Sequence, residues 1–246
     1  MILHPEEFVD LPTPTGTMRA FVYRPVAPGK YPGIVFYSEI YQVTGPIRRM
    51  AATLAGHGFI VVIPEIFHEF EPLGTGLQYN NEDTDKGNKY KIAKTIQAYD
   101  DDTHAAVEYL LQHSHCNKNI GAMGVCIGGH LSFRAAMHPS VKAAACFYAT
   151  DIHKRSLGKG GDNSLDRFGD IKGELLMIWG RQDPHIPDEG RALIYQKLVE
   201  HKISFTWHEF NAQHAFMRDE GHKGRFDPAL ALTCYRLSVD LFQRAL

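Results

Sequence analysis

The sequence has 246 residues, enough for one large α/β domain or two small ones. Hydrophobic residues make up 44% and charged residues 22%, which is typical of a globular protein with a sizeable core. A formal net charge of −2 gives no electrostatic argument for nucleic acid or an anionic membrane as the main partner. The opening MILHPEEFVDLP lacks a basic segment followed by an apolar one, and no stretch reaches the ~18 apolar residues of a membrane-spanning helix. We therefore expect a soluble, cytoplasmic protein.

The first half of the chain alternates strand and helix patterns. A strand over 18–25 ends at proline, and continuous apolar runs predict strands buried on both faces at 33–38 and 59–64. Between them, apolar residues at helical spacing predict a helix over 45–58 that ends at glycine. A second helix, 100–113, begins with three aspartates, which suit the helix dipole.

The same alternation continues to the end of the chain. The elements expected there are a strand at 119–125, a helix at 128–138, strands at 142–149 and 174–180, a helix at 188–202, a strand at 204–210 and a helix at 227–246. This order predicts an α/β fold with a mostly parallel central sheet covered by helices on both faces. Two long polar segments, 65–98 and 151–173, are expected to be loops that carry function or disorder.

Three chemically reactive residues each follow a different predicted strand. Cys126 follows 119–125 in GAMGVCIGGH, Asp183 follows 174–180 in WGRQDPHIP, and His214 follows 204–210 in FNAQHAFM. In such a sheet, reactive groups collect at the carboxyl ends of the strands. The order of nucleophile, acid and histidine is that of α/β-hydrolases, with cysteine in place of serine in the G-x-S-x-G turn.

The surroundings of Cys126 suit a nucleophile. Gly124 and Gly128 remove side chains that would clash in a sharp turn between strand and helix. The N–H of Ile127 lies at the start of the helix, where it can stabilise an oxyanion, and the helix terminus favours a thiolate.

Simpler interpretations exist for each residue. A buried cysteine is usually a small hydrophobic residue, Asp183 can be a turn residue before proline, and His214 can be an ordinary loop histidine. The four scattered cysteines form no CxxC pair or short disulfide framework, and reduced thiols are the simpler expectation. The glycines do not match G-x-G-x-x-G, and HSHC (113–116) is better explained as a solvated loop than as metal ligands. The three residues together, in this order, favour the catalytic hypothesis.

Four motifs occur together in this chain: GVCIGG, SEI after an early strand, GRQDPHIP and AQHAF. On these four motifs taken together, the chain resembles the dienelactone hydrolase (carboxymethylenebutenolidase-like) family of α/β-hydrolases. The similarity runs from about residue 16 to the C-terminus and implies a single domain over 1–246. The family's catalytic triad corresponds to Cys126, Asp183 and His214.

The resemblance also implies roles for residues near the triad. Glu39 corresponds to a glutamate that holds the resting thiol until substrate displaces it, and the N–H of Ile40 to a second oxyanion donor. Arg218 corresponds to an arginine that binds the substrate carboxylate. The second such arginine of the founding enzymes has no counterpart in 65–98, where Lys86, Lys89 and Lys91 are the available cations, and Lys89 is our candidate.

Two alternatives stay open for these residues. Glu39 can be a rim carboxylate paired with Arg48 or Arg49, and Arg218 can be a surface cation. The leading hypothesis is a cysteine-dependent hydrolase of small, neutral or anionic esters or lactones that works through a thioester without metal or cofactor. The alternatives are a general carboxylesterase or thioesterase, and a non-catalytic redox-sensing or ligand-binding module. The sequence leaves open whether the protein is a monomer or a weak homodimer.

Overall fold

Eight strands form one sheet in the computed structural model, which describes residues 1–221 and 223–246. The strand order is β1-β2-β4-β3-β5-β6-β7-β8; β2 pairs antiparallel with β1 and β4, and the remaining pairs are parallel. The strands are β1 (Glu7–Thr13), β2 (Gly16–Tyr23), β3 (Tyr31–Tyr37), β4 (Ile60–Pro64), β5 (Cys116–Val125), β6 (Val141–Phe147), β7 (Glu174–Gly180) and β8 (Phe205–Phe210).

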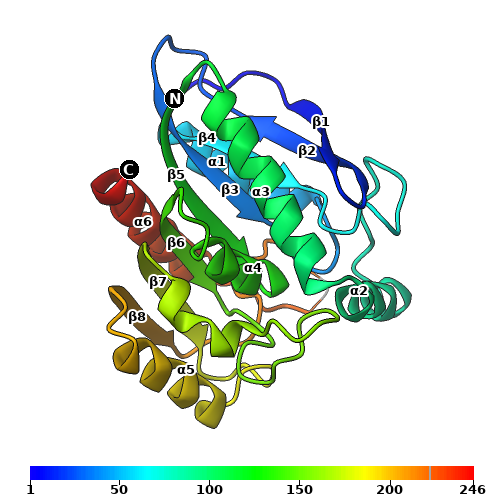
Figure 1. Cartoon of the computed structure of the whole chain (residues 1–246), viewed down its shortest axis with the longest axis vertical. Helices are drawn as coiled ribbons and strands as arrows, with labels where there is room; N and C mark the ends of the chain where they lie inside the picture. The colour runs from blue at the N-terminus through cyan, green and yellow to red at the C-terminus, as the bar shows by residue number, and fades with distance from the viewer. Residues whose placement is uncertain (222) are drawn as a thin grey trace.

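Helices cover both faces of this sheet. In Figure 1, α3 and α4 lie in front of the sheet, α1 and α6 lie behind it, and α2 projects from the side. The helices are α1 (Gly45–Gly56), α2 (Asn81–Ala93), α3 (Ile96–Gln112), α4 (Ile127–Ala135), α5 (Asp188–Glu200) and α6 (Pro228–Ala245). The expected α/β architecture, with a mostly parallel sheet between two helical layers, is therefore confirmed.

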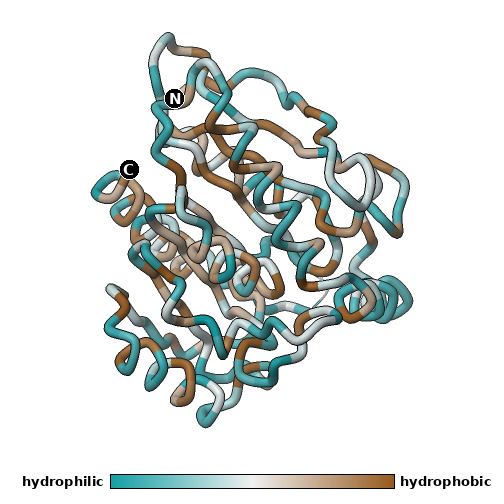
Figure 2. Tube along the Cα trace, in the orientation of Figure 1, coloured by the Kyte–Doolittle hydropathy of each residue, from teal (hydrophilic) through white to brown (hydrophobic). Residues whose placement is uncertain are grey.

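The core lies along the central strands. Every residue of β4 is buried, and so are the last six residues of β5, because both faces of these strands are covered. Figure 2 shows hydrophobic chain in the centre and a mainly hydrophilic α2 at the side. No helix in the two described ranges is long and apolar enough to cross a bilayer.

The structure corrects the predicted elements at three places. Strand β1 lies at the end of the sheet, and its alternating exposure was not recognised in the opening segment. The expected loop 65–98 contains α2, whose N-cap Asn80 accepts a hydrogen bond from the Asp83 N–H. Helix α3 begins at Ile96 rather than at residue 100, because Thr95 caps it through the Ala98 N–H. The prediction of a loop failed at α2 because few of its side chains are apolar.

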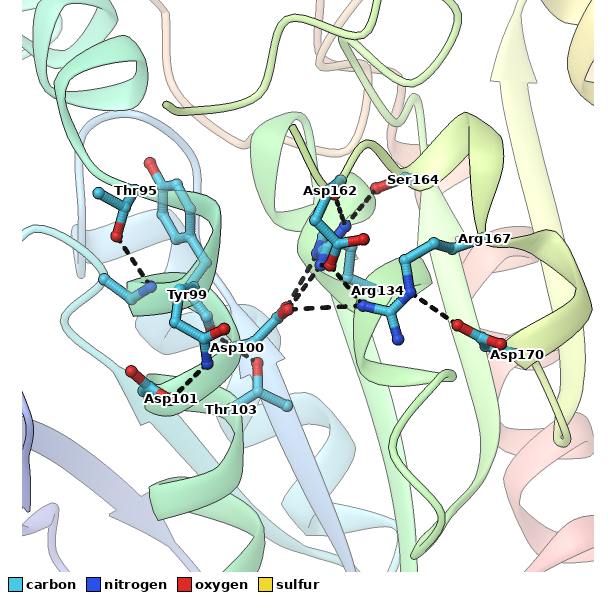
Figure 3. A network of polar contacts seen from close by, with 12 residues as sticks. Thr95, Tyr99, Asp100, Asp101, Thr103, Arg134, Asp162, Ser164, Arg167 and Asp170 are labelled. Atoms are coloured by element: carbon cyan, nitrogen blue, oxygen red, sulfur yellow. Dashed lines mark hydrogen bonds and ion pairs between the residues drawn. The ribbon is translucent and has the colours of Figure 1, made fainter. Parts of the chain in front are cut away.

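The second expected loop, 151–173, is held against α3 and α4 by a network of charges (Figure 3). The buried Arg134 of α4 donates to both carboxylate oxygens of Asp100 in α3, at 2.9 and 2.5 Å. It also donates to the Asp162 carbonyl oxygen and to Ser164 Oγ. Arg167 continues the network to Asp162 and Asp170. One buried guanidinium thus fixes a long segment that contains only two short 3₁₀ turns, 164–166 and 168–170.

Candidate active site

Cys126 occupies the sharp turn between β5 and α4. Its backbone has φ 61° and ψ −123°, a strained conformation for a residue with a side chain. The turn fits only with glycine on each side. A Cβ on Gly124 would lie 1.9 Å from the Gly128 carbonyl oxygen, and a Cβ on Gly128 would lie 2.2 Å from the Tyr37 carbonyl oxygen. Contacts between backbone atoms therefore fix the position of the thiol.

Asp183 and His214 form a buried pair beside this turn. Asp183 lies just beyond β7, and His214 lies just beyond β8. His214 Nδ1 is 2.6 Å from Asp183 Oδ2, and the other carboxylate oxygen of Asp183 accepts the His185 N–H at 2.9 Å. This second bond fixes the carboxylate, which in turn orients the imidazole ring.

The electrostatic environment of His214 favours its protonated form. Burial of the ring opposes the positive charge, but the charge of the Cys126 sulfur and hydrogen bonds to Asp183 and Cys126 outweigh this effect. Together these effects raise the pKa of His214 to about 10. The imidazole can therefore hold a proton that it takes from a neighbouring group.

Two backbone N–H groups next to the thiol are available as donors. Ile127 is the first residue of α4, and Ile40 lines the same pocket as Cys126. Within the described chain, neither N–H donates to another backbone or side-chain acceptor. Helix α2 packs directly on the backbone of Ile40, because a Cβ on Gly87 would lie 2.4 Å from the Ile40 carbonyl oxygen. A helix that the sequence did not reveal thus supports one of the two candidate oxyanion donors.

Glu39 is buried and paired with Arg218. Arg218 Nη1 lies 3.3 Å from each Glu39 carboxylate oxygen, and the Tyr79 hydroxyl donates to Oε2 at 3.4 Å. Arg218 also pairs with Glu220 at 3.0 Å and stacks over the Tyr79 ring at 4.7 Å. In the part of the chain that is described, no hydrogen bond joins Glu39 to Cys126.

The alternative interpretations of Glu39 and Arg218 are wrong. Glu39 is 1% exposed and does not pair with either expected arginine, since Arg48 pairs with Glu6 and Arg49 with Asp219. Arg218 is 6% exposed and is therefore not a surface cation.

The structure brings most of the predicted residues into one pocket. Glu39, Ile40, Cys126, His214 and Arg218 line it, while Asp183 lies behind His214. Two further predicted residues lie outside the pocket lining: Ile127 is buried directly after Cys126, and Lys89 is exposed. The neighbouring Lys91 lines the pocket instead, 2.9 Å from Asp151 Oδ2.

Several lining residues were not predicted from the sequence. They come from α2 and from the loops after β6, β7 and β8, and include Thr84, Asn88, Asp151, Lys154, His185, Lys223 and Arg225. The only available signal was that long charged loops follow strands whose carboxyl ends carry the site. The ring of His185 lies against the His214 ring, with centroids 4.6 Å apart, and desolvation and the His214 charge lower the pKa of His185 to about 4.

Within residues 1–221 and 223–246, two groups of side chains have metal-ligating atoms close together. The first is Asp183, His185 and His214, whose facing atoms are used by the Asp183–His214 hydrogen bond. The second is His68, Glu69 and Asp102, where the Lys94 ammonium lies 2.6 Å from Glu69 and 2.5 Å from Asp102. Contacts within the protein thus account for both groups.

Comparison with known proteins agrees with this geometry. The model of the "Dienelactone hydrolase family" matches residues 18–246. A Saccharomyces cerevisiae protein named "Putative carboxymethylenebutenolidase" is 44% identical, over 98% of this chain and 92% of its own length. The "Carboxymethylenebutenolidase" of Pseudomonas putida is 28% identical over 78% of each chain.

A solved structure from Klebsiella pneumoniae, described as a "Putative Dienelactone Hydrolase", has the same fold. It superposes with a TM-score of 0.83 at 21% identity and covers 99% of this chain and 100% of its own. The family model spans nearly the whole sequence, including the turn at Cys126 and the loops of Asp183 and His214. The chain therefore belongs to the dienelactone hydrolase family.

Proposed function

We propose that this carboxylic ester hydrolase acts on small esters or lactones through a thioester on Cys126. The observation that carries the proposal is the position of the Cys126 thiol, which lies at a strained turn facing the buried His214–Asp183 pair. The names of the relatives support the substrate class. Each role below follows from the contact that the residue makes.

Acylation begins with the thiol proton. His214 takes this proton, and the Cys126 thiolate attacks the carbonyl carbon to form a C–S bond. The carbonyl oxygen becomes an oxyanion, which the N–H groups of Ile40 and Ile127 stabilise. Collapse of the tetrahedral intermediate breaks the bond to the alkoxy oxygen, and protonated His214 gives its proton to that oxygen.

Deacylation uses water and returns the enzyme to its first state. His214 takes a proton from water, whose oxygen attacks the thioester carbon at the same oxyanion site. The C–S bond breaks, the carboxylic acid leaves, and His214 returns the proton to the sulfur. Asp183 holds the imidazole through Nδ1 throughout. The net reaction adds one water to one ester bond.

Glu39 acts on the nucleophile through its charge. In this structure Arg218 and Tyr79 bind the Glu39 carboxylate, so among the described residues Glu39 makes no hydrogen bond to the thiol and His214 can take the thiol proton. A carboxylate that instead moves to the thiol would accept its S–H and oppose a second negative charge. Glu39→Gln should therefore speed alkylation of Cys126 by iodoacetamide near neutral pH. Mass spectrometry of the Cys126 peptide measures the rate of labelling. Unchanged or slower labelling would exclude this role.

Turnover of 4-nitrophenyl acetate tests the proposal. Cys126→Ala should lower kcat by about 10³-fold or more, and Asp183→Asn should lower it by a similar order. Mass spectrometry of acid-quenched wild type should show an acetyl group on the Cys126 peptide. Asp240→Asn, at an exposed carboxylate outside the pocket, is the matched control and should keep turnover. A redox-sensing module would show neither steady turnover nor acyl transfer.

A further inference from the structure

The mouth of the pocket carries more positive charge than its own carboxylates neutralise. Among the described residues, five lysine and arginine side chains line the pocket, against two carboxylates, Glu39 and Asp151. Asp151 is taken by Lys91 at 2.9 Å. Glu39 is taken by Arg218, which pairs with Glu220 as well. The two ion pairs leave the other basic residues without a counter-charge in the lining.

These remaining residues are Lys154, Lys223 and Arg225, which we call the cationic rim. Across residues 1–221 and 223–246, none of the three forms a hydrogen bond or ion pair with a carboxylate. Lys154 comes from the loop after β6, whereas Lys223 and Arg225 come from the loop between β8 and α6. Two segments far apart in the sequence thus bring like charges to one opening, which is favourable when an anion lies between them.

The inner end of the pocket has a different character. There Cys126, His214 and the Ile40 backbone form the reacting centre. Among the described residues, the cationic groups at this end are His214 and Arg218, and both are buried and already paired, His214 with Asp183 and Arg218 with Glu39. A free anionic group placed there would lose its water without gaining an unpaired cation. The negative charge of a substrate is therefore best placed at the mouth, while its carbonyl group reaches Cys126.

We propose that the cationic rim selects esters or lactones that carry two or more negative charges at the end far from the reacting carbonyl. A phosphate-like group or a pair of carboxylates has this chemistry. The inference rests on the proposed hydrolase function and adds the substrate class. It also gives the rim, rather than Arg218, the task of binding the anionic group.

Three 4-nitrophenyl esters test this selectivity, because they share a leaving group. They are the acetate, which is neutral, the 3-phosphonopropionate, and the monoester of tricarballylic acid, which retains two carboxylates. The measured quantity is kcat/KM for each anionic ester divided by kcat/KM for the acetate. In K154Q/K223Q/R225Q this ratio should fall by about tenfold or more. In wild type, 0.5 M NaCl should lower it in the same direction.

A matched control removes the same charge elsewhere. K142Q/K172Q/R236Q neutralises three exposed basic residues outside the pocket lining and should keep the wild-type ratio. Equal ratios in the rim variant, the control and the wild type would overturn the inference. A fall with only the phosphonate or only the tricarballylate ester would restrict the rim to that class and support it.

Direct binding separates this inference from the hydrolase mechanism. Calorimetry of Cys126→Ala with 3-phosphonopropionate and with tricarballylate should show binding that weakens about tenfold or more when the rim substitutions are added. Propionate, with one carboxylate and no second anionic group, should bind far more weakly. Rim-dependent binding without ester turnover by the wild type would contradict the proposed function and support the rim. Turnover with no rim-dependent binding would do the reverse.

Discussion

The turn at Cys126 and the mouth of the same pocket are built from different parts of the chain. At the turn, backbone atoms fill the available space, so that a single Cβ on Gly124 would meet the Gly128 carbonyl oxygen at 1.9 Å. At the mouth, long charged side chains from α2 and two loops surround open space. One region fixes a reactive atom, and the other presents groups that can be exchanged without moving the sheet.

Because of this difference, we expect the turn to govern the rate of the reaction and the mouth to govern which substrates are accepted. The strained backbone of Cys126 is held by its neighbours in β5, β3 and α4, which are all buried. The charges at the mouth contribute to which substrate enters, and exposed charges such as Lys154 and Lys223 add little to folding stability. We expect substitutions at the turn to act on folding and chemistry, and those at the mouth to act on substrate choice.

Substitution at the turn should have the largest effect. Gly124→Ala places a methyl group against the backbone of α4, and neither partner is a flexible side chain that can move away. We expect a loss of about 3 kcal/mol or more in the free energy of unfolding, measured by urea denaturation. Gly161→Ala is the control, since its Cβ would meet nothing within 4 Å. If the two variants were equally stable, the turn would be more adaptable than its geometry indicates.

Helix α2 joins the two regions and should give an intermediate effect. Gly87→Ala favours the helix by about 1 kcal/mol in intrinsic propensity, but its methyl group would lie 2.4 Å from the Ile40 carbonyl oxygen. Displacing the Ile40 backbone also shifts its N–H, which is one of the two oxyanion donors, so kcat for 4-nitrophenyl acetate should fall about tenfold. Lys89→Ala, at an exposed position of α2, should leave kcat unchanged. Equal rates in both variants would show that α2 does not support the Ile40 N–H.

The smallest effect should come from His185, beside the mouth. Desolvation and the charge of His214 lower its pKa to about 4 from the usual 6.5. Because the folded state binds this proton less readily than the unfolded state, stability is fully present above pH 6.5 and is lost as the pH falls toward 4. After allowance for solvent screening of this exposed ring, we expect a loss on the order of 1 kcal/mol.

Urea unfolding between pH 7 and pH 4 measures this loss. His185→Asn should flatten the pH dependence relative to wild type. His201→Asn, at an exposed residue after α5, should retain the wild-type slope. An identical slope in wild type and His185→Asn would show that the fold does not depress the pKa of this imidazole.

The two regions also differ in how much the sequence reveals. The turn is encoded locally, since glycines at 124 and 128 around a cysteine after an apolar run are enough to predict it. The expected meeting of Cys126, Asp183 and His214 followed from strand order, because parallel strands end at one edge. Their catalytic roles stay predictions.

The mouth could not be predicted in the same way. Helix α2 is mostly polar, and what positions it is a close approach of Gly87 to Ile40, a contact between residues far apart in the sequence. Lys86, Lys89 and Lys91 lie within a few positions of one another in the sequence. Among them, only Lys91 lines the pocket in the described structure. Similarly, the partner of Glu39 is Arg218, 179 residues away. These contacts depend on packing between residues that are far apart in the sequence, and a local sequence pattern does not predict them.

The order of strands also determines how the protein loses activity when it is warmed. His214 is held by the loop after β8, which closes one end of the sheet, while Cys126 follows the central β5. Edge strands open at lower free energy than central ones. Warming should therefore release the imidazole while the thiol keeps its place, so that inactivation precedes loss of the bulk fold. Molecules in that state would carry an intact nucleophile without its base, and they could regain activity on cooling for as long as the sulfur escaped oxidation.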